Sequence, residues 1–297
     1  MIGFNLHKVR RHFAEVLAQR FSDRESEQLL RVLLEDLFGF DRKRLLMEPD
    51  LRIDEAQYAQ LQAAVAQLLE GVPVQYVTGL AQFDNNIIKV NPSVLIPRPE
   101  TEELVGKVAE CLQGEGPVGW GGASDMPLRI WDIGTGSGCI AIALAKRFPQ
   151  SEVKAFDLSR EALEVAAENA LANEVEVEFI CDDVLHPRSE VFGEPVDVVV
   201  SNPPYIRDSE RATMEPNVLD HEPSQALFVP DDDPLLYYRQ ILLLAQPQLK
   251  PGGVVWFEIN EALGEEMLRL CEEYGFHPIL LEDYASKPRF IFAKKCS

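Results

Sequence analysis

The sequence predicts an α/β fold: a mainly parallel sheet of seven strands, covered by helices on both faces and preceded by a small helical bundle. Residues 1–75 carry apolar residues at helical spacing. Residues 101–297 alternate short apolar runs with amphipathic helical segments, which is typical of parallel βαβ units. Between them, residues 76–100 are rich in turn-forming residues. We therefore expect an N-terminal helical domain, a β-hairpin linker and a C-terminal sheet domain with these boundaries.

Three apolar stripes in the N-terminal segment predict the helices of the bundle. The stripes are formed by Val9, Phe13, Val16 and Leu17, by Leu29, Leu30, Leu33, Leu34 and Leu37, and by Leu61, Val65, Leu68 and Leu69. Asp23 and Asp54 are the expected N-caps, and Gly39 and Gly71 are the expected helix ends. No catalytic constellation is evident in this segment, so its stripes are expected to form a core.

The linker is expected to form a hairpin, because the apolar runs 82–83 and 87–90 flank a turn-prone segment at 84–86. Strands and helices then alternate along the chain. The predicted strands are 128–133, 152–157, 177–181, 196–200, 254–259, 278–282 and 290–293, and the predicted helices are 101–112, 139–148, 160–173, 235–249 and 264–274. Residues 113–127 are expected to form an exposed loop.

Composition excludes several classes of protein. The chain has 49 acidic and 28 basic residues, a net charge of -21, so it would gain little from neutralising phosphates and no direct binding to nucleic acid is expected. No apolar run reaches the length of a membrane span, and the first residues do not resemble a signal peptide. The five cysteines are scattered. We expect a cytoplasmic protein without a disulfide framework or a metal site.

A glycine-rich loop, Gly134-Thr135-Gly136-Ser137-Gly138, connects the first predicted strand of the sheet to the next helix. Glycine lets the backbone approach a ligand closely, and a helix N-terminus offers free N–H groups. The spacing is neither the dinucleotide fingerprint G-x-G-x-x-G nor a phosphate loop ending in G-K-[ST]. A tight strand-to-helix turn is the alternative interpretation of the same glycines.

Acidic residues end the next two predicted strands. Asp157 can accept hydrogen bonds from both hydroxyls of a ribose, and Asp182 or Asp183 can meet an adenine amino group. We favour Asp183 for the adenine. The alternatives are a helix cap for Asp157 and a solvated loop acid at the other two positions. Because no cation is provided for a phosphate, the pattern indicates a nucleoside without phosphates, such as S-adenosylmethionine.

The segment Asn202-Pro203-Pro204-Tyr205 follows the buried run 196–200, at the end of a strand where parallel sheets place functional groups. Its two prolines fix two φ angles and remove two amide donors. The Asn202 side-chain oxygen and the Pro203 carbonyl remain as acceptors, beside the face of Tyr205. This arrangement suits a planar NH2 group with two hydrogens to donate. A rigid turn with a packed tyrosine is the alternative.

Together, these motifs resemble those of methyltransferases that modify amino groups with S-adenosylmethionine. Further segments make the chain similar to the release factor glutamine methyltransferases, the HemK/PrmC family, over residues 20–294. These segments are Leu95-Ile96-Pro97-Arg98-Pro99-Glu100-Thr101-Glu102, Glu222-Pro223 with Ala226-Leu227, and Lys287-Pro288-Arg289-Phe290.

The resemblance implies a Rossmann-like seven-stranded methyltransferase sheet and a helical bundle that docks the substrate. The implied substrate is a class-1 peptide chain release factor, methylated on the side-chain amide nitrogen of the glutamine in its Gly-Gly-Gln motif. The segment Asn202-Pro203-Pro204-Tyr205 would bind that glutamine, with Asn202, Pro203 and Tyr205 as the catalytic residues. The cofactor-binding residues implied are Gly134, Thr135, Gly136, Ser137, Gly138, Asp157, Asp183, Val184 and Asn202.

Some positions leave alternatives open. Val184 stands where the family often has an aromatic residue, and 231–234 stands where it usually has a glycine. Arg98 suits either an ion pair at the domain joint or substrate docking, and Glu258 either a cofactor site or a loop. Competing functions are a ribosomal-protein glutamine methyltransferase, a DNA adenine methyltransferase, which the acidic charge disfavours, and a non-catalytic scaffold.

Overall fold

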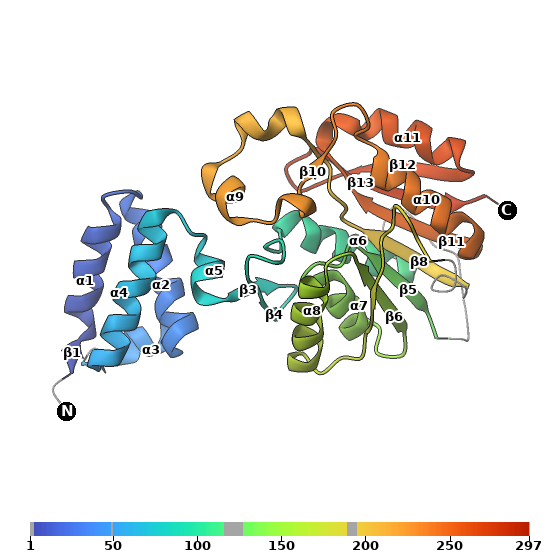
Figure 1. Cartoon of the computed structure of the whole chain (residues 1–297). Coiled ribbons are helices and arrows are strands. Elements are labelled where there is room, and N and C mark those ends of the chain that lie inside the picture. The colour runs from blue at the N-terminus through green and yellow to red at the C-terminus, as the bar shows by residue number, and fades with distance from the viewer. Residues whose placement is uncertain (1–2, 49, 116–126, 189–194, 297) are drawn as a thin grey trace. The chain divides into compact units, whose positions relative to one another are not determined.

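The computed structural model describes residues 3–48, 50–115, 127–188 and 195–296. Most of the predicted loop at 113–127 lies outside them. The chain forms two compact units, Met1–Leu80 with Glu215–His221, and Ala81–Met214 with Glu222–Ser297 (Figure 1). Among the described residues, no helix is both long and apolar enough to span a bilayer.

The first unit is a helical bundle. Its elements are α1 (Leu6–Leu17), α2 (Asp23–Phe38), α3 (Arg42–Met47), α4 (Glu55–Glu70), α5 (Val74–Thr78), α9 (Pro216–His221) and the antiparallel pair β1 (Phe4–Asn5) and β2 (Arg52–Ile53). Every residue of the three predicted apolar stripes lies in its core cluster or packs against it. The prediction that these stripes form a core is therefore confirmed.

The ends of the long helices follow local chemistry. Gly39 and Gly71 end α2 and α4 with φ of 67° and 97°, as predicted. Asp54 caps α4, and its side chain and that of Gln57 form a reciprocal capping box. The predicted cap at Asp23 is wrong by one residue, because the Ser22 hydroxyl caps α2. Asp23 is the first helical residue, where its charge still favours the helix dipole.

The predicted hairpin is formed by β3 (Leu80–Phe83) and β4 (Asn86–Lys89). Its two-residue turn is Asp84 and Asn85, with φ of 48° and 60°. Positive φ at both central positions is what a type I′ hairpin turn requires, and Asp and Asn tolerate it better than most residues.

The second unit contains a seven-stranded sheet in the order β12-β13-β11-β8-β5-β6-β7, which confirms the predicted fold class. Its strands are β5 (Arg129–Ile133), β6 (Glu152–Asp157), β7 (Glu178–Cys181), β8 (Val196–Ser201), β11 (Leu249–Glu258), β12 (Phe276–Glu282) and β13 (Pro288–Lys295). Strand β13 runs antiparallel between β11 and β12, and the other neighbouring strands are parallel.

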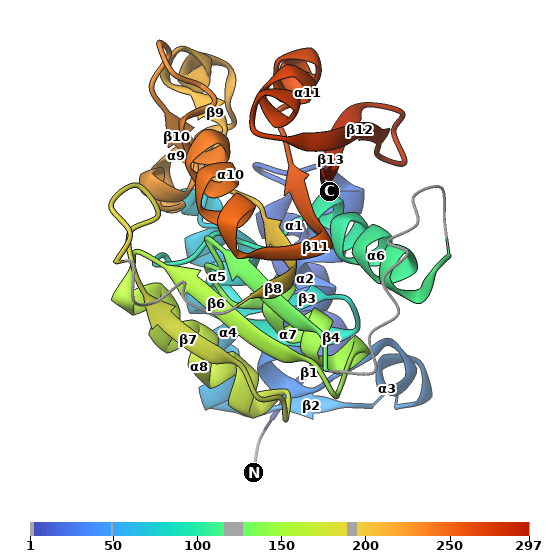
Figure 2. The ribbon, with the colours of Figure 1, turned by 90° about the vertical axis from the view of Figure 1, so that its right-hand side faces the viewer.

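Helices cover both faces of this sheet (Figure 2). Helices α6 (Pro99–Gln113), α7 (Cys139–Arg147) and α8 (Arg160–Ala172) pack on one face, and α10 (Leu236–Gln248) and α11 (Gly264–Glu273) on the other. Right-handed crossovers run from β5 towards β7 in one direction and from β8 towards β11 in the other, so their helices cover opposite faces. Short elements that the sequence did not predict follow β8: β9 (Ile206–Arg207), η1 (Asp208–Thr213), η2 (Ser224–Ala226) and β10 (Phe228–Val229), with η3 (Glu261–Leu263) after β11.

The strand order reverses at β5, because the chain continues to β6 on one side while β8 lies on the other. Ile133 and Ser201 are register partners at the carboxyl ends of β5 and β8. The Ser201 hydroxyl donates a hydrogen bond to the Ile133 carbonyl at 2.5 Å. Parallel sheets of this type bind ligands at the carboxyl ends of the strands beside such a reversal.

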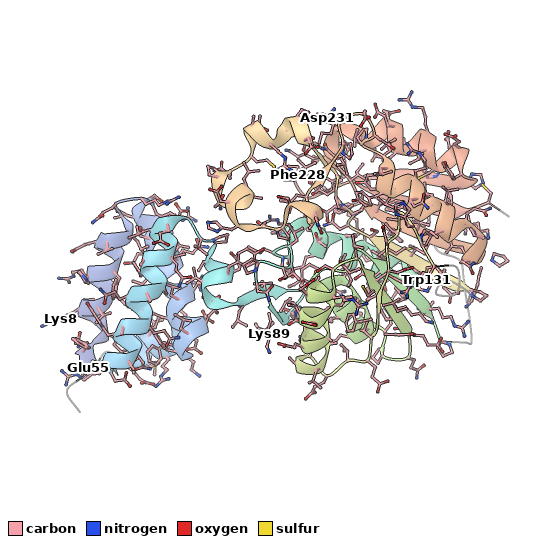
Figure 3. The ribbon with its side chains drawn as sticks, viewed as in Figure 1. Lys8, Glu55, Lys89, Trp131, Phe228 and Asp231 are labelled. Atoms are coloured by element: carbon pink, nitrogen blue, oxygen red, sulfur yellow. The ribbon has the colours of Figure 1, made fainter. Side chains whose placement is uncertain are left out.

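Asn169 on α8 connects the hairpin to the glycine-rich loop. Its Oδ1 accepts from the backbone N of Lys89 (labelled in Figure 3) at 2.7 Å, and its Nδ2 donates to the Lys89 carbonyl at 2.9 Å. Nδ2 also donates to the carbonyl of Ser137 at 2.9 Å. Because the Asn169 side chain is fully buried, water does not take its place as the hydrogen-bond partner of these backbone groups.

We expect Asn169→Ala to lower the free energy of unfolding by about 3 kcal/mol, since buried donors and acceptors lose their partner. Asn173→Ala is the matched control, because Asn173 is the C-cap residue that follows α8 and is more accessible, and we expect it to cost less than about 1 kcal/mol. Urea denaturation measures both. Equal losses in the two variants would contradict the role assigned to Asn169.

Candidate functional site

A cavity of about 800 Å³ lies at the carboxyl ends of β5, β6, β7 and β8. Its walls combine the glycine-rich loop, the strand-ending acids, the Asn-Pro-Pro-Tyr segment and the segment before η2. The lining includes Val94, Leu95, Gly134, Gly136, Asp157, Asp182, Asp183, Val184, Asn202, Pro203, Pro204, Gln225 and Tyr237. The sequence motifs predicted to work together are therefore brought together in one place.

The glycine-rich loop separates into residues that face the cavity and residues that shape the loop. Gly134 and Gly136 line the cavity with φ of 76° and 55°. A Cβ on either would meet nothing within 4 Å, so positive φ is what requires glycine there. Gly138 differs, because its Cβ would lie 3.0 Å from the Cβ of Ala166 on α8. It allows α7 and α8 to pack closely.

Thr135 and Ser137, also predicted to bind the cofactor, are buried within the loop. The Thr135 hydroxyl donates to Oδ2 of Asp132 at 2.6 Å, and the backbone N of Ala141 on α7 donates to the same oxygen at 3.1 Å. No described residue donates to the buried Oδ1 of Asp132. Burial raises the pKa of Asp132 to about 7 against the effect of these two donors. Asp132 was not singled out from the sequence, and it organises the loop from beneath.

Asp157 lines the cavity and also supports the loop. Its Oδ2 accepts from the backbone N of Gly136 at 2.8 Å, and its Oδ1 accepts from the backbone N of Ser159 at 2.9 Å. Burial raises its pKa, and these backbone donors oppose the rise. Each carboxylate oxygen can accept a further hydrogen bond, so the predicted contact with two ribose hydroxyls remains chemically possible.

The structure distinguishes the two acids that follow β7. Asp182 is buried, and Arg188 donates to both of its oxygens, from Nε at 2.8 Å and from the backbone N at 3.1 Å. Asp183 is more accessible. Burial would raise the pKa of Asp183, but hydrogen bonds from His186 and from the backbone of Leu185 outweigh it and lower the pKa. This geometry supports Asp183 as the adenine acceptor.

The apolar wall of the cavity includes Val184, Leu185 and Ile241. Its aromatic members include Tyr237, which comes from α10 on the other face of the sheet. An aromatic ring of the cavity wall therefore comes from a helix to which sequence reasoning assigned no site residue.

In the Asn-Pro-Pro-Tyr segment, Asn202, Pro203 and Pro204 line the cavity. Asn202 Nδ2 donates to the hydroxyl oxygen of Thr101 at 3.1 Å. The Thr101 hydroxyl in turn donates to Oε2 of Glu258 at 2.7 Å. Sequence reasoning did not assign a role to Thr101, although it stands within the quoted 95–102 segment.

Tyr205 lies behind the cavity wall and packs against the main core cluster. Its hydroxyl donates to Oε1 of Glu258 at 3.1 Å. The Glu258 side chain is thus a buried acid that links both ends of the motif, and not a loop charge. Burial raises the pKa of Glu258, while the Thr101 and Tyr205 hydroxyls oppose the rise. The predicted contact of Tyr205 with a substrate amide stays a prediction.

Arg98 forms an ion pair within the second unit. Its Nη2 lies 2.6 Å from Oε1 of Glu222, and the backbone N of Ile96 donates to the other carboxylate oxygen at 3.3 Å. The side chain of Glu222 is only 1% exposed. This pair ties together two walls of the cavity, at Leu95 and Pro223, and favours the ion-pair interpretation of Arg98.

The charges around the cavity fit a nucleoside without phosphates. The acids that line it are Asp157, Glu161, Asp182 and Asp183, and none of the described lining residues is Lys or Arg. A phosphate would meet net repulsion there, whereas hydroxyls and an amino group would find acceptors.

Comparisons with known proteins agree with this geometry. The family model for the PrmC N-terminal domain matches residues 8–79, and that for the methyltransferase small domain matches residues 124–221. The release factor glutamine methyltransferase of Flavobacterium psychrophilum is 42% identical over 95% of this chain and 96% of its own length. That of Bacteroides thetaiotaomicron is 36% identical over 98% of this chain and 100% of its own length.

A solved methyltransferase structure from Pyrococcus furiosus superposes with a TM-score of 0.50 at 17% identity, covering 82% of this chain and 99% of that chain. At this identity the likeness supports the fold alone.

The raised pKa of Asp132 makes stability depend on pH. Between about pH 4 and 7 the carboxyl is ionised in the unfolded chain but stays protonated in the folded chain. The free energy of unfolding therefore falls by up to about 1.4 kcal/mol per pH unit as the pH rises. Asp132→Asn cannot ionise and lacks this loss. We expect its stability relative to the native chain to improve steadily from pH 4.5 to 7.5 in urea denaturation. A constant difference across that range would contradict the assigned pKa.

Proposed function

This chain belongs to the release factor glutamine methyltransferase family, and from that premise we propose that it methylates the side-chain amide nitrogen of a glutamine in a class-1 peptide chain release factor. The proposed target is the glutamine of the Gly-Gly-Gln motif. The observation that carries this proposal is the row of acceptors at Asn202 and Pro203, on the wall of a cavity that suits a phosphate-free nucleoside.

S-adenosylmethionine supplies the methyl group when bound. The residues that would hold it are the backbone of Gly134 and Gly136, the carboxylate of Asp157 beneath a ribose, and Asp183 beside an adenine. Hydrogen bonds with Asp132 and Asn169 support the backbone of this loop from beneath.

An amide nitrogen is a poor nucleophile, because its lone pair is delocalised into the carbonyl. Asn202 Oδ1 and the Pro203 carbonyl would accept its two N–H bonds and orient the nitrogen. Acceptors placed this way also stabilise the positive charge that develops on nitrogen, so their effect is largest in the transition state. The two prolines keep the acceptors rigid, which in-line transfer requires.

The nitrogen's extra proton needs no strong base in this scheme, since a positively charged amide nitrogen is a strong acid. The buried acid nearest the motif, Glu258, already accepts hydrogen bonds from Thr101 and Tyr205. Its position behind the motif suits support of the site more than proton removal.

The substrate is tested by incubating the purified protein with S-adenosylmethionine and a purified release factor, followed by peptide mass spectrometry. We expect one added methyl group on the Gly-Gly-Gln glutamine and none on a factor carrying Gly-Gly-Ala. Ribosomal protein and DNA, incubated in parallel with labelled cofactor, test the two competing substrate classes. Label in either of them with an unmodified release factor would contradict the proposal.

We expect Asn202→Ala to lower kcat by about 100- to 1,000-fold, because one of two charge-stabilising acceptors is lost. Cofactor affinity, measured by calorimetry, should change by less than about threefold. Asn173→Ala, outside the cavity, is the matched control and should keep its turnover. Near-normal turnover by the Asn202 variant would refute the role of this acceptor.

A further inference from the structure

We propose that Thr101 and Glu258 are positioning residues that fix which way the Asn202 side-chain amide points. In this arrangement the amide NH2 is turned towards Thr101, and the amide oxygen is left to accept from the substrate. The inference rests on the proposed function, because it explains how Asn202 comes to offer an acceptor to a glutamine NH2.

The argument begins with Glu258, whose carboxylate has two oxygens that can only accept hydrogen bonds. The two hydroxyls within reach, of Thr101 at 2.7 Å and of Tyr205 at 3.1 Å, must therefore both donate to it. A hydroxyl has one proton, so once the Thr101 proton points at Glu258, the Thr101 oxygen can only accept from Asn202.

This polarity selects one of the two orientations of the Asn202 amide. Only its NH2 can donate to the Thr101 oxygen, at 3.1 Å. In the reversed orientation, the amide oxygen would face an oxygen that has no proton to give. The NH2 would then face the substrate NH2, donor against donor, and the acceptor would be lost.

The network is held by distant parts of the second unit. Thr101 is 3% exposed and lies in the first turn of α6, which Pro99 begins. Glu258 is 1% exposed at the end of β11, where it is the register partner of Phe290 on β13. The hydroxyl of fully buried Tyr238 donates to the Glu258 carbonyl at 3.0 Å. Neither Thr101 nor Glu258 is free to turn away from Asn202.

The two hydroxyl donors on Glu258 favour its carboxylate form, which this assignment requires. Burial raises the pKa of Glu258, and the negative charge of Glu100 adds to the rise, while the Thr101 and Tyr205 hydroxyls and the positive charge of Arg289 oppose it. A higher pH favours the carboxylate form, in which both hydroxyls must donate, so turnover is measured at pH 8.

The test uses the full chain with two substitutions at Thr101. Thr101→Val removes the hydroxyl at nearly constant volume, and Thr101→Ser keeps a hydroxyl as the matched control. We expect T101V to lower kcat about tenfold, the worth of one hydrogen bond. T101S should stay within about threefold of the native chain. Calorimetric cofactor affinity should remain near native for both, and thermal unfolding should show T101V folded but less stable than T101S, because a buried acceptor loses its donor.

A double-mutant cycle with Asn202→Ala separates positioning from a general structural role. If Thr101 acts through Asn202, T101V should lower turnover by less than about twofold in the Asn202→Ala background. A tenfold loss that persists there, or native turnover by T101V alone, would overturn the positioning role. Native turnover by Asn202→Ala would refute the acceptor role of Asn202, whereas a native chain that adds no methyl group to the release factor glutamine would overturn the proposed function, so the failures are distinct.

The second variant is Glu258→Gln, whose amide can accept only one of the two hydroxyls. It should lower kcat, and its effect should also disappear in the Asn202→Ala background. If T101V does not fold, this cycle alone decides the proposal. Direct observation comes from NMR of ¹⁵N-asparagine-labelled protein: the Asn202 side-chain NH2 should exchange slowly in the native chain and T101S, and faster in T101V. Equal exchange rates would overturn the inference.

Discussion

The parallel pairing of β5 with β8 is the constraint on which the rest of the site depends. It places Ile133 and Ser201 opposite each other, joined by a hydrogen bond between the Ser201 hydroxyl and the Ile133 carbonyl. The glycine-rich loop and the Asn-Pro-Pro-Tyr segment both start at this pair. A shift of one residue in this register would move the side chains of the shifted strand to the opposite face of the sheet and separate the two motifs. The packed sheet core therefore determines the geometry of the site.

The two acids that support the glycine-rich loop are held by N–H and O–H donors, whereas Asp182 and Glu222 pair with arginines. Asp132 is held by a hydroxyl and a helix N–H, and Asp157 by two backbone N–H groups. At Asp157, which lines the cavity, neutral dipoles of this kind carry no positive charge to cancel the negative potential of the carboxylate. Such a potential attracts a cationic ligand, which suits the sulfonium centre of S-adenosylmethionine and repels phosphates. The acidity seen in the composition thus has a local counterpart at the site.

Much of the fold could be predicted from the sequence because its signals are local: apolar periodicity, helix-ending glycines and strand-ending motifs. Asn202 was identifiable for the same reason, since its neighbours are prolines. Thr101 was not, because its partners Asn202 and Glu258 stand 101 and 157 residues away, and no spacing rule connects them. The sequence also did not predict which residues of the glycine-rich loop line the cavity and which pack beneath it, because this depends on how the loop packs against α8. The cap of α2 was missed by one residue, because Ser22 and Asp23 are both good capping residues.

The sequence separation of this hydrogen-bond network bears on the order in which the protein matures during translation. Asn202 leaves the ribosome before Glu258. The hydrogen bond between Thr101 and Glu258 spans 157 residues, so it forms only after the intervening chain has folded. A nascent chain that ends before β11 therefore contains the whole Asn-Pro-Pro-Tyr segment without the acid that orients it. The hydrogen-bond network around Asn202 is therefore complete only once β11 has joined the sheet.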